Sequence, residues 1–152
     1  MTPRSATPLF VDTSAFYAHF VENAPRHGEA RGVFDGIRTD DLPYRPLVTS
    51  SYVLSELATL LLRKTSQTVA SDALERIRSS SVVSIVHPNE SEFAAVCQSF
   101  ERFDDQRISF VDHSIAVLAR QRGVEHVFAF DDDFRVFDLA VVPADTGDVT
   151  GQ

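Results

Sequence analysis

The stretch LFVDTSAF, residues 9–16, decides the fold class of this sequence. Residues 9–11 are a short apolar run, which is the pattern of a buried strand, and Phe16 and Phe20 then follow at helical spacing. Asp12 stands at the junction between the two. A strand that leads through a polar junction into a helix is the first half of a βα unit, and such units build parallel sheets.

Short apolar runs alternate with helical patterns along the rest of the chain. Further strands are predicted at residues 47–48, 82–86, 126–130 and 139–142, with helices between them. The strongest helical stripe lies in SSYVLSELATLLLRK, residues 50–64, whereas TDDLPYRP, residues 39–46, has the turn-forming residues of a connection. This alternation predicts an α/β fold in which helices cover both faces of a mostly parallel sheet.

The composition indicates one globular domain without a membrane span. The 152 residues, 43% of them hydrophobic, are enough for one packed core. No stretch approaches the ~20 apolar residues of a transmembrane helix, and the opening MTPRSATP lacks the apolar region of a signal peptide. We expect a cytoplasmic protein whose residues 8–144 form the domain and whose residues 1–7 and 145–152 are flexible ends.

The net charge of -8 restricts the kind of function. Proteins that coat nucleic acid neutralise phosphates with lysine and arginine, and this chain has 14 such residues against 22 aspartates and glutamates. A nuclease is compatible with this charge, because a bound metal ion can supply positive charge at a phosphate.

Two acidic residues follow strands that are far apart in the sequence. Asp12 follows the first strand in FVDTSAF, and Asp131 follows a later strand in VFAFDDDF. Ligands of open α/β sheets bind at the carboxyl ends of the strands, where a crevice can bring such residues together. Alternatively, each carboxylate simply caps the helix that follows it.

Two further carboxylates lie in helical segments. Ser109 and Asp112, in ISFVDHSIAVLARQRG, have the spacing of a capping box, which predicts a helix with Asp112 in its first turn. Glu56 lies in the strongest apolar helix, on the same side as Val53 and Leu57, so we expect it to be partly buried. A partly buried carboxylate needs a cation or a hydrogen-bond donor beside it.

Carboxylates gathered at one site repel one another unless a cation lies between them. Oxygen ligands favour Mg²⁺ or Mn²⁺ over zinc, and the 5 histidines are scattered without a zinc-binding spacing. A metal held by carboxylates can orient and acidify a water molecule and stabilise charge on phosphate oxygens. The pattern is therefore typical of phosphodiester hydrolysis, with no nucleophilic side chain required.

At these residues the sequence resembles the PIN-domain ribonucleases, and in particular the VapC-type toxins of toxin–antitoxin pairs. The resemblance runs from Leu9 to Val142 through four segments in order: FVDTSAFYA, VTSSYVLSELATLL, ISFVDHSIAVLARQRG and VFAFDDDFRVF. It implies that the metal is held, and the reaction carried, by four acids: Asp12, Glu56, Asp112 and Asp131. The expected supporting residues are Thr13, Ser14, Ser109 and Asp133. Thr13 or Ser14 supplies a hydroxyl beside Asp12, and Asp133 accompanies Asp131.

The resemblance also implies a biological setting. We expect a PIN-like three-layer α/β/α sandwich, a homodimer, and cleavage of single-stranded RNA with Mg²⁺ or Mn²⁺. The expected partner is a cognate antitoxin with a basic side chain that enters the acidic pocket, since an arginine can replace the charge of the metal.

Two alternatives stay open at this point. A PIN-like fold that binds RNA or a protein without cleaving RNA would keep the architecture and lose the chemistry. A phosphoacceptor receiver-like domain is also a parallel α/β protein with an acidic Mg²⁺ pocket. It needs an acidic pair after its first strand and a lysine after a late strand. Here Asp12 has no acidic neighbour, and the only lysine, Lys64, lies at the end of a predicted helix.

Overall fold

The computed structural model describes residues 5–104 and 106–148 of the chain. Within them, five strands form one sheet in the order β3-β2-β1-β4-β5, and each neighbouring pair is parallel. The strands are β1 (Thr7–Val11), β2 (Tyr44–Ser50), β3 (Val83–Val86), β4 (His126–Phe128) and β5 (Ala140–Val142). The α/β fold with a central parallel sheet, predicted from the sequence, is confirmed.

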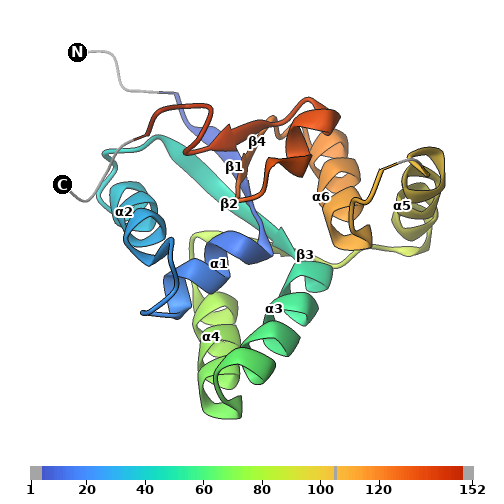
Figure 1. Cartoon of the computed structure of the whole chain (residues 1–152). Helices are drawn as coiled ribbons and strands as arrows, with labels where there is room; N and C mark the ends of the chain where they lie inside the picture. The colour runs from blue at the N-terminus through green and yellow to red at the C-terminus, as the bar shows by residue number, and fades with distance from the viewer. Residues whose placement is uncertain (1–4, 105, 149–152) are drawn as a thin grey trace.

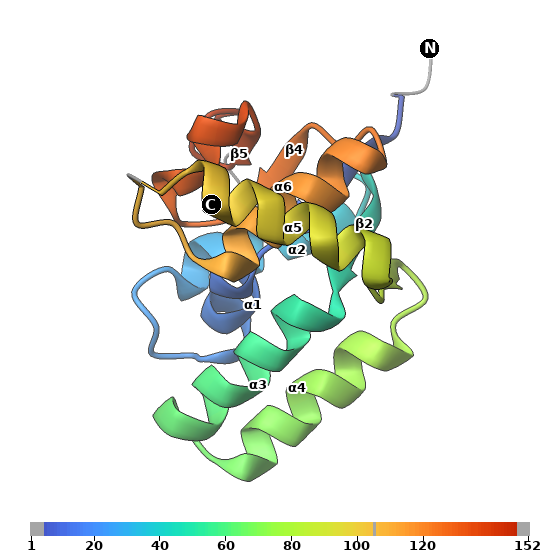
Figure 2. The ribbon, with the colours of Figure 1, turned by 90° about the vertical axis from the view of Figure 1, so that its right-hand side faces the viewer.

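Helices connect the successive strands. They are α1 (Thr13–Phe20) and α2 (His27–Arg38) after β1, α3 (Ser51–Lys64) and α4 (Gln67–Ser79) after β2, α5 (Glu90–Arg102) and α6 (Phe110–Gln121) after β3, and a 3₁₀ helix, η1 (Asp132–Phe137), after β4. The helices α1, α2 and α4 lie on one side of the sheet and α5 and α6 on the other, which makes a three-layer sandwich (Figure 1). Figure 2 shows α5 beside α6, and α3 running alongside α4.

The strand order places a switch point between β1 and β4. The chain adds β2 and β3 on one side of β1, and then β4 and β5 on the other. Because crossovers between parallel strands are right-handed, this reversal of direction moves the later helices to the opposite face. A receiver-like domain has a different order, in which the second strand is outermost and the third lies beside the first. This topology therefore excludes the receiver-like alternative.

The central strands are buried on both faces. Leu9, Phe10 and Val11 of β1 are all 0% exposed, which is the pattern of a parallel strand covered by helices on each side. The fully buried ring of Phe128 in β4 packs against Phe34 of α2, with centroids 5.0 Å apart. The neighbouring strands β1 and β4 thus lie in the middle of the core.

The start of β2 differs from the prediction. The strand begins at Tyr44, so the last residues of the expected connection TDDLPYRP belong to it. Between Thr7 and Leu9 of β1, the partner residues on β2 advance from Tyr44 to Leu47, which leaves one extra residue in β2. This irregularity accommodates Pro46, which has no N–H to donate to the neighbouring strand. It explains how a turn-like sequence can be part of the sheet.

The end of β4 also differs, since the strand stops at Phe128 and not at residue 130. The N–H of Phe130 donates to the Oγ of Ser14 at 3.0 Å instead of joining a strand ladder. A side chain from the start of α1 therefore ends the strand and bends the chain toward η1.

Ordered structure reaches slightly beyond the expected domain limits of 8–144. Thr7 pairs with Tyr44, and in the tail Asp145 forms an ion pair with Arg135 while Asp148 accepts a hydrogen bond from the hydroxyl of Tyr44. Of the ends expected to be flexible, residues 1–4 and 149–152 lie outside the described residues. None of the helices in the described part of the chain is long and apolar enough to span a membrane.

We expect Phe128→Ala to lower the free energy of unfolding by about 3–5 kcal/mol, because it removes a fully buried ring from the core. Chemical denaturation measures the loss. The control is Leu62→Ala on α3, where the side chain is 55% exposed and the change should stay within about 0.5 kcal/mol. Equal effects of the two substitutions would contradict a central, covered β4.

Candidate metal centre

Asp12 follows β1 and caps α1. Its Oδ2 accepts hydrogen bonds from the backbone N–H of Ser14 at 3.1 Å and from the Ser14 hydroxyl at 2.6 Å. The residue is 3% exposed, and its other oxygen, Oδ1, is buried without a hydrogen-bond partner among the described residues. Capping therefore uses one oxygen of this carboxylate and leaves the other available to a ligand.

Ser14 joins the ends of two strands. Its hydroxyl donates to Asp12 and accepts from the N–H of Phe130, so it connects the start of α1 to the segment that leads from β4 to Asp131. Thr13 is also buried, but its hydroxyl has no hydrogen-bond partner in the described part of the chain. Of the two hydroxyl groups considered from the sequence, that of Ser14 is the one that hydrogen-bonds Asp12.

Asp131 and Asp133 come together at the start of η1. Asp131 is the N-cap, and its Oδ1 accepts a hydrogen bond from the backbone N–H of Asp133 at 2.9 Å. Asp132 between them turns outward, with its side chain 84% exposed, and forms an ion pair with Arg135 at 2.8 Å. The tight turn thus directs two of the three consecutive acids toward one place and the third toward solvent.

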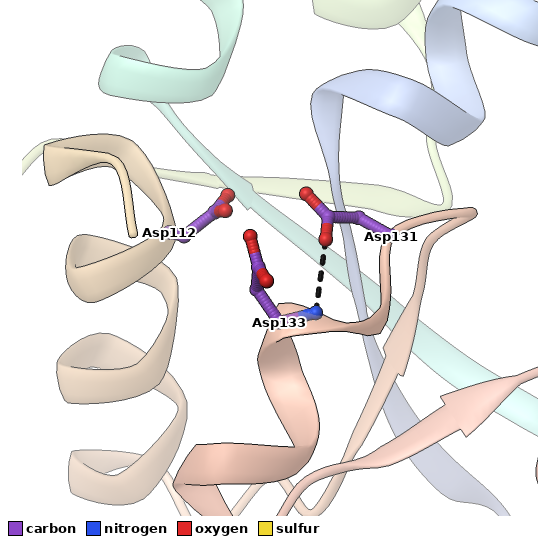
Figure 3. A group of neighbouring side chains, drawn as sticks. All are labelled: Asp112, Asp131 and Asp133. Atoms are coloured by element: carbon purple, nitrogen blue, oxygen red, sulfur yellow. Dashed lines mark hydrogen bonds between the residues drawn. The ribbon is translucent and has the colours of Figure 1, made fainter. Parts of the chain in front are cut away.

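Asp112 meets this pair from the first turn of α6. Ser109 caps the helix by accepting from the N–H of Asp112 at 3.1 Å, so the predicted helix start is confirmed. One carboxylate oxygen from each of Asp112, Asp131 and Asp133 lies within 4.8 Å of the others. Figure 3 shows Asp112 reaching from its helix toward the side chains of Asp131 and Asp133.

Glu56 lies at the edge of this group. It is half-buried on α3, as expected from its helical position. Its charge contributes to the raised pKa of Asp12 and of Asp112, which places it in the same negative field. Glu56 is not one of the three carboxylates whose oxygens lie within 4.8 Å of one another. The four acids singled out in the sequence are thus neighbours, with Asp133 among the closest.

The site carries strong negative charge, and two of its acids, Asp12 and Asp112, are buried. Burial is the largest cause that raises the pKa of Asp112, and together with the charges of Asp12, Asp131, Glu56 and Asp133 it brings that pKa to about 8. Burial also raises the pKa of Asp12 to about 6, although its hydrogen bonds with Ser14 act in the opposite direction. The pKa of Asp133 is raised by burial and then by the charge of Asp131. Such a group is stabilised by a cation more than by water.

The donor set fits a hard divalent cation. All the close donors are carboxylate oxygens, which suit Mg²⁺ or Mn²⁺ better than zinc. The buried and unpaired Oδ1 of Asp12 offers one more oxygen to a ligand in the same negative field. Asp12, Asp112, Asp131 and Asp133 are therefore the residues that could hold such an ion.

His113, beside Asp112, holds the two acid-bearing elements together. It is 1% exposed, its Nδ1 hydrogen-bonds the hydroxyl of Ser99 at 2.8 Å, and its ring packs edge-on against Phe137 of η1 with centroids 5.0 Å apart. The sequence has no signal that separates this histidine from the other four, because its partners come from α5 and η1. The contact of His113 with Phe137 links α6 to η1 and so keeps the distance between these two elements.

Comparisons with known proteins cover most of the chain. The family model described as PIN domain matches residues 9–139. The 23S rRNA-specific endonuclease VapC20 of Mycobacterium tuberculosis is 32% identical over 128 residues, which cover 83% of this chain and 91% of that protein.

Solved structures give the same fold. The crystal structure of Mycobacterium tuberculosis VapC20, described as a Sarcin-Ricin loop cleaving toxin, matches with a TM-score of 0.74 and 31% identity, over 84% of this chain and 93% of that one. VapBC2 from Rickettsia felis, bound to a DNA fragment from its promoter, matches with a TM-score of 0.66 over 89% of this chain and 97% of that one. Its identity is only 12%, so this second likeness concerns the fold alone.

The raised pKa of Asp112 predicts how metal-free stability depends on pH. The pKa is 3.8 in the unfolded chain and about 8 in the folded one, so between these values the folded protein holds a proton that the unfolded chain has released. The free energy of unfolding therefore falls as the pH rises through this window. In EDTA, Asp112→Asn should stabilise the protein by about 1–2 kcal/mol at the upper end of the window and much less at the lower end.

Thermal unfolding with EDTA and with Mn²⁺ measures this difference. Mn²⁺ should raise the melting temperature of the wild type more at the upper end of the window, because protons compete with the cation there least. The outward-facing Asp132→Asn is the matched control and should keep the wild-type response. A Mn²⁺ effect that survives unchanged in Asp112→Asn would refute the metal centre.

Proposed function

This chain belongs to the PIN domain family, and from that premise we propose that it is a metal-dependent endoribonuclease acting as the toxin of a toxin–antitoxin pair. The observation that carries the proposal is the meeting of Asp112, Asp131 and Asp133, with oxygens within 4.8 Å of one another, beside the buried Asp12. Three chain segments far apart in sequence supply these acids. Carboxylates concentrated at one place suit a cation that acts on phosphate.

The residues have separate tasks in the proposed reaction. Asp12, Asp112, Asp131 and Asp133 would hold Mg²⁺ or Mn²⁺, which would supply an acidified water and neutralise charge on the phosphate oxygens. Ser14 fixes the carboxylate of Asp12 by its 2.6 Å hydrogen bond.

Glu56, at the edge of the group, accepts a proton from the attacking water. A new P–O bond then forms as the bond to the leaving ribose oxygen breaks, and the leaving oxygen takes a proton from solvent. Residues 8–144, with the flanking residues that pair with them, form the domain proposed to carry out this reaction. The reaction needs no nucleophilic side chain.

We take single-stranded RNA as the substrate class. VapC20, the relative at 32% identity, is named for its action on 23S rRNA, so ribosomal RNA is the first substrate to test. The proposed setting is the cytoplasm, and the proposed assembly is a homodimer. The retention of all four acids favours cleavage over a PIN-like domain that only binds RNA or protein.

The proposed partner is a cognate antitoxin. Structural neighbours include VapBC-5 from Mycobacterium tuberculosis, described as a member of the VapBC family of toxin–antitoxin systems. Such a partner could inhibit this chain by placing an arginine among the carboxylates, since a guanidinium replaces the charge of a cation and pairs with carboxylates in two-point contacts.

Asp12→Asn should reduce cleavage of RNA in Mg²⁺ or Mn²⁺ by at least about 100-fold, because it removes a charged oxygen from the metal centre without changing its size. The assay follows the loss of intact RNA over time, and circular dichroism checks that the fold is kept. Asp132→Asn in the same acidic run is the matched control and should retain near wild-type rates. Wild-type rates in Asp12→Asn would contradict the proposed enzyme.

A further inference from the structure

A groove of about 510 Å³ opens beside the acidic centre, between α3 and the first residues of α6. Tyr52, Glu56 and Arg63 line it from α3, and Phe110 lines it from α6. Glu56 belongs both to this groove and to the negative field around Asp112. The groove therefore adjoins the metal centre through Glu56.

The walls of the groove near α6 are aromatic. The ring of Phe110 lies 6.0 Å from that of Tyr52, centroid to centroid, and 5.9 and 5.8 Å from those of Phe93 and Phe100 on α5. Phe93 is 48% exposed and Phe100 is 45% exposed, so this cluster reaches the surface. Aromatic rings beside an RNA-cutting centre offer stacking surfaces for unpaired bases.

The other end of the groove is cationic. Arg63 lies on α3 two turns beyond Glu56, roughly 10 Å along the helix axis. Within residues 5–104 and 106–148, no carboxylate forms an ion pair with Arg63. The net charge of the chain is -8, yet the guanidinium of Arg63 in this groove is available to pair with a phosphate.

We propose that this groove is the subsite for a nucleotide that flanks the scissile phosphate of single-stranded RNA. In this site the base stacks on Tyr52 and Phe110, and a neighbouring phosphate pairs with Arg63. The hydroxyls of Ser55 and Thr59, which also line the groove, can hydrogen-bond the ribose 2′-OH, a group that DNA lacks. This inference rests on the proposed ribonuclease function and adds the residues that hold the substrate.

A second copy of this chain is the competing occupant of the aromatic surface. A two-fold dimer would place the same surface of both copies face to face. Here that surface adjoins Glu56 and the buried acids, so such contact would bring two negative centres close together. RNA instead brings a phosphate to Arg63 and bases to the rings, and the charges of the groove therefore favour it.

The test uses full-length protein carrying Asp12→Asn, so that RNA is bound but not cut, and a fluorescein-labelled, mixed-sequence single-stranded RNA. Fluorescence anisotropy gives the Kd at several salt concentrations. Arg63→Gln should weaken binding about 10-fold and lower the slope of log Kd against log salt by about one, because one phosphate contact is lost. Tyr52→Leu should weaken binding about 5- to 30-fold, whereas Tyr52→Phe, which keeps the ring, should bind normally.

Arg78→Gln is the matched control for charge. This exposed arginine stands in the last turn of α4, outside the groove, and its loss should leave the Kd within about twofold of the reference. In the background that keeps Asp12, the groove variants should raise KM for RNA cleavage more than they lower kcat, because they act on substrate binding.

The outcomes separate the subsite from the enzyme. If the wild type cleaves RNA in an Asp12-dependent way but Arg63→Gln and Tyr52→Leu bind RNA normally, the subsite is wrong and the enzyme stands. If those variants change the oligomeric state in sedimentation without changing RNA affinity, the groove is a contact between copies and the proposal is again wrong. If the wild type neither binds nor cleaves RNA, the proposed function itself fails.

Discussion

Repulsion among the carboxylates that gather beyond the ends of β1 and β4 is the constraint on which the rest of this structure depends. Asp12, Asp112 and Asp133 all have a raised pKa, and burial is the largest cause in each case. A chain selected only for stability would replace such residues with apolar or neutral ones. Their presence at the switch point of the sheet is therefore best explained by a bound cation and the chemistry that it would perform.

The fold offsets this repulsion by using helix ends. Asp12 caps α1, Asp131 caps η1, and Asp112 lies in the first turn of α6, so each acid stands where backbone N–H groups point outward. The partial positive charge at such an end favours a carboxylate. Capping and metal binding are thus two uses of the same residues. The Ser14 hydroxyl also fixes the carboxylate of Asp12, and by accepting from the N–H of Phe130 it ends β4 before Asp131.

Local signals explain why much of the fold could be predicted. The apolar run before Asp12 and the S-x-x-D spacing of Ser109 and Asp112 mark where elements begin and end, and the structure has them there. What could not be predicted depends on residues distant in the sequence. The entry of Pro46 into a strand depends on pairing with β1, and the packing of His113 depends on α5 and η1. The sequence alone likewise did not show that the backbone N–H of Asp133 donates to the side chain of Asp131. This hydrogen bond brings Asp133 into the group of carboxylates.

A crystal of the metal-free protein soaked in Mn²⁺, with diffraction recorded where manganese scatters anomalously, tests the account most directly. The account predicts one strong anomalous peak bounded by the carboxylates of Asp112, Asp131 and Asp133, with the unpaired oxygen of Asp12 facing the same space. A map without a peak at that position, while Mn²⁺ occupies other surface carboxylates, would contradict it.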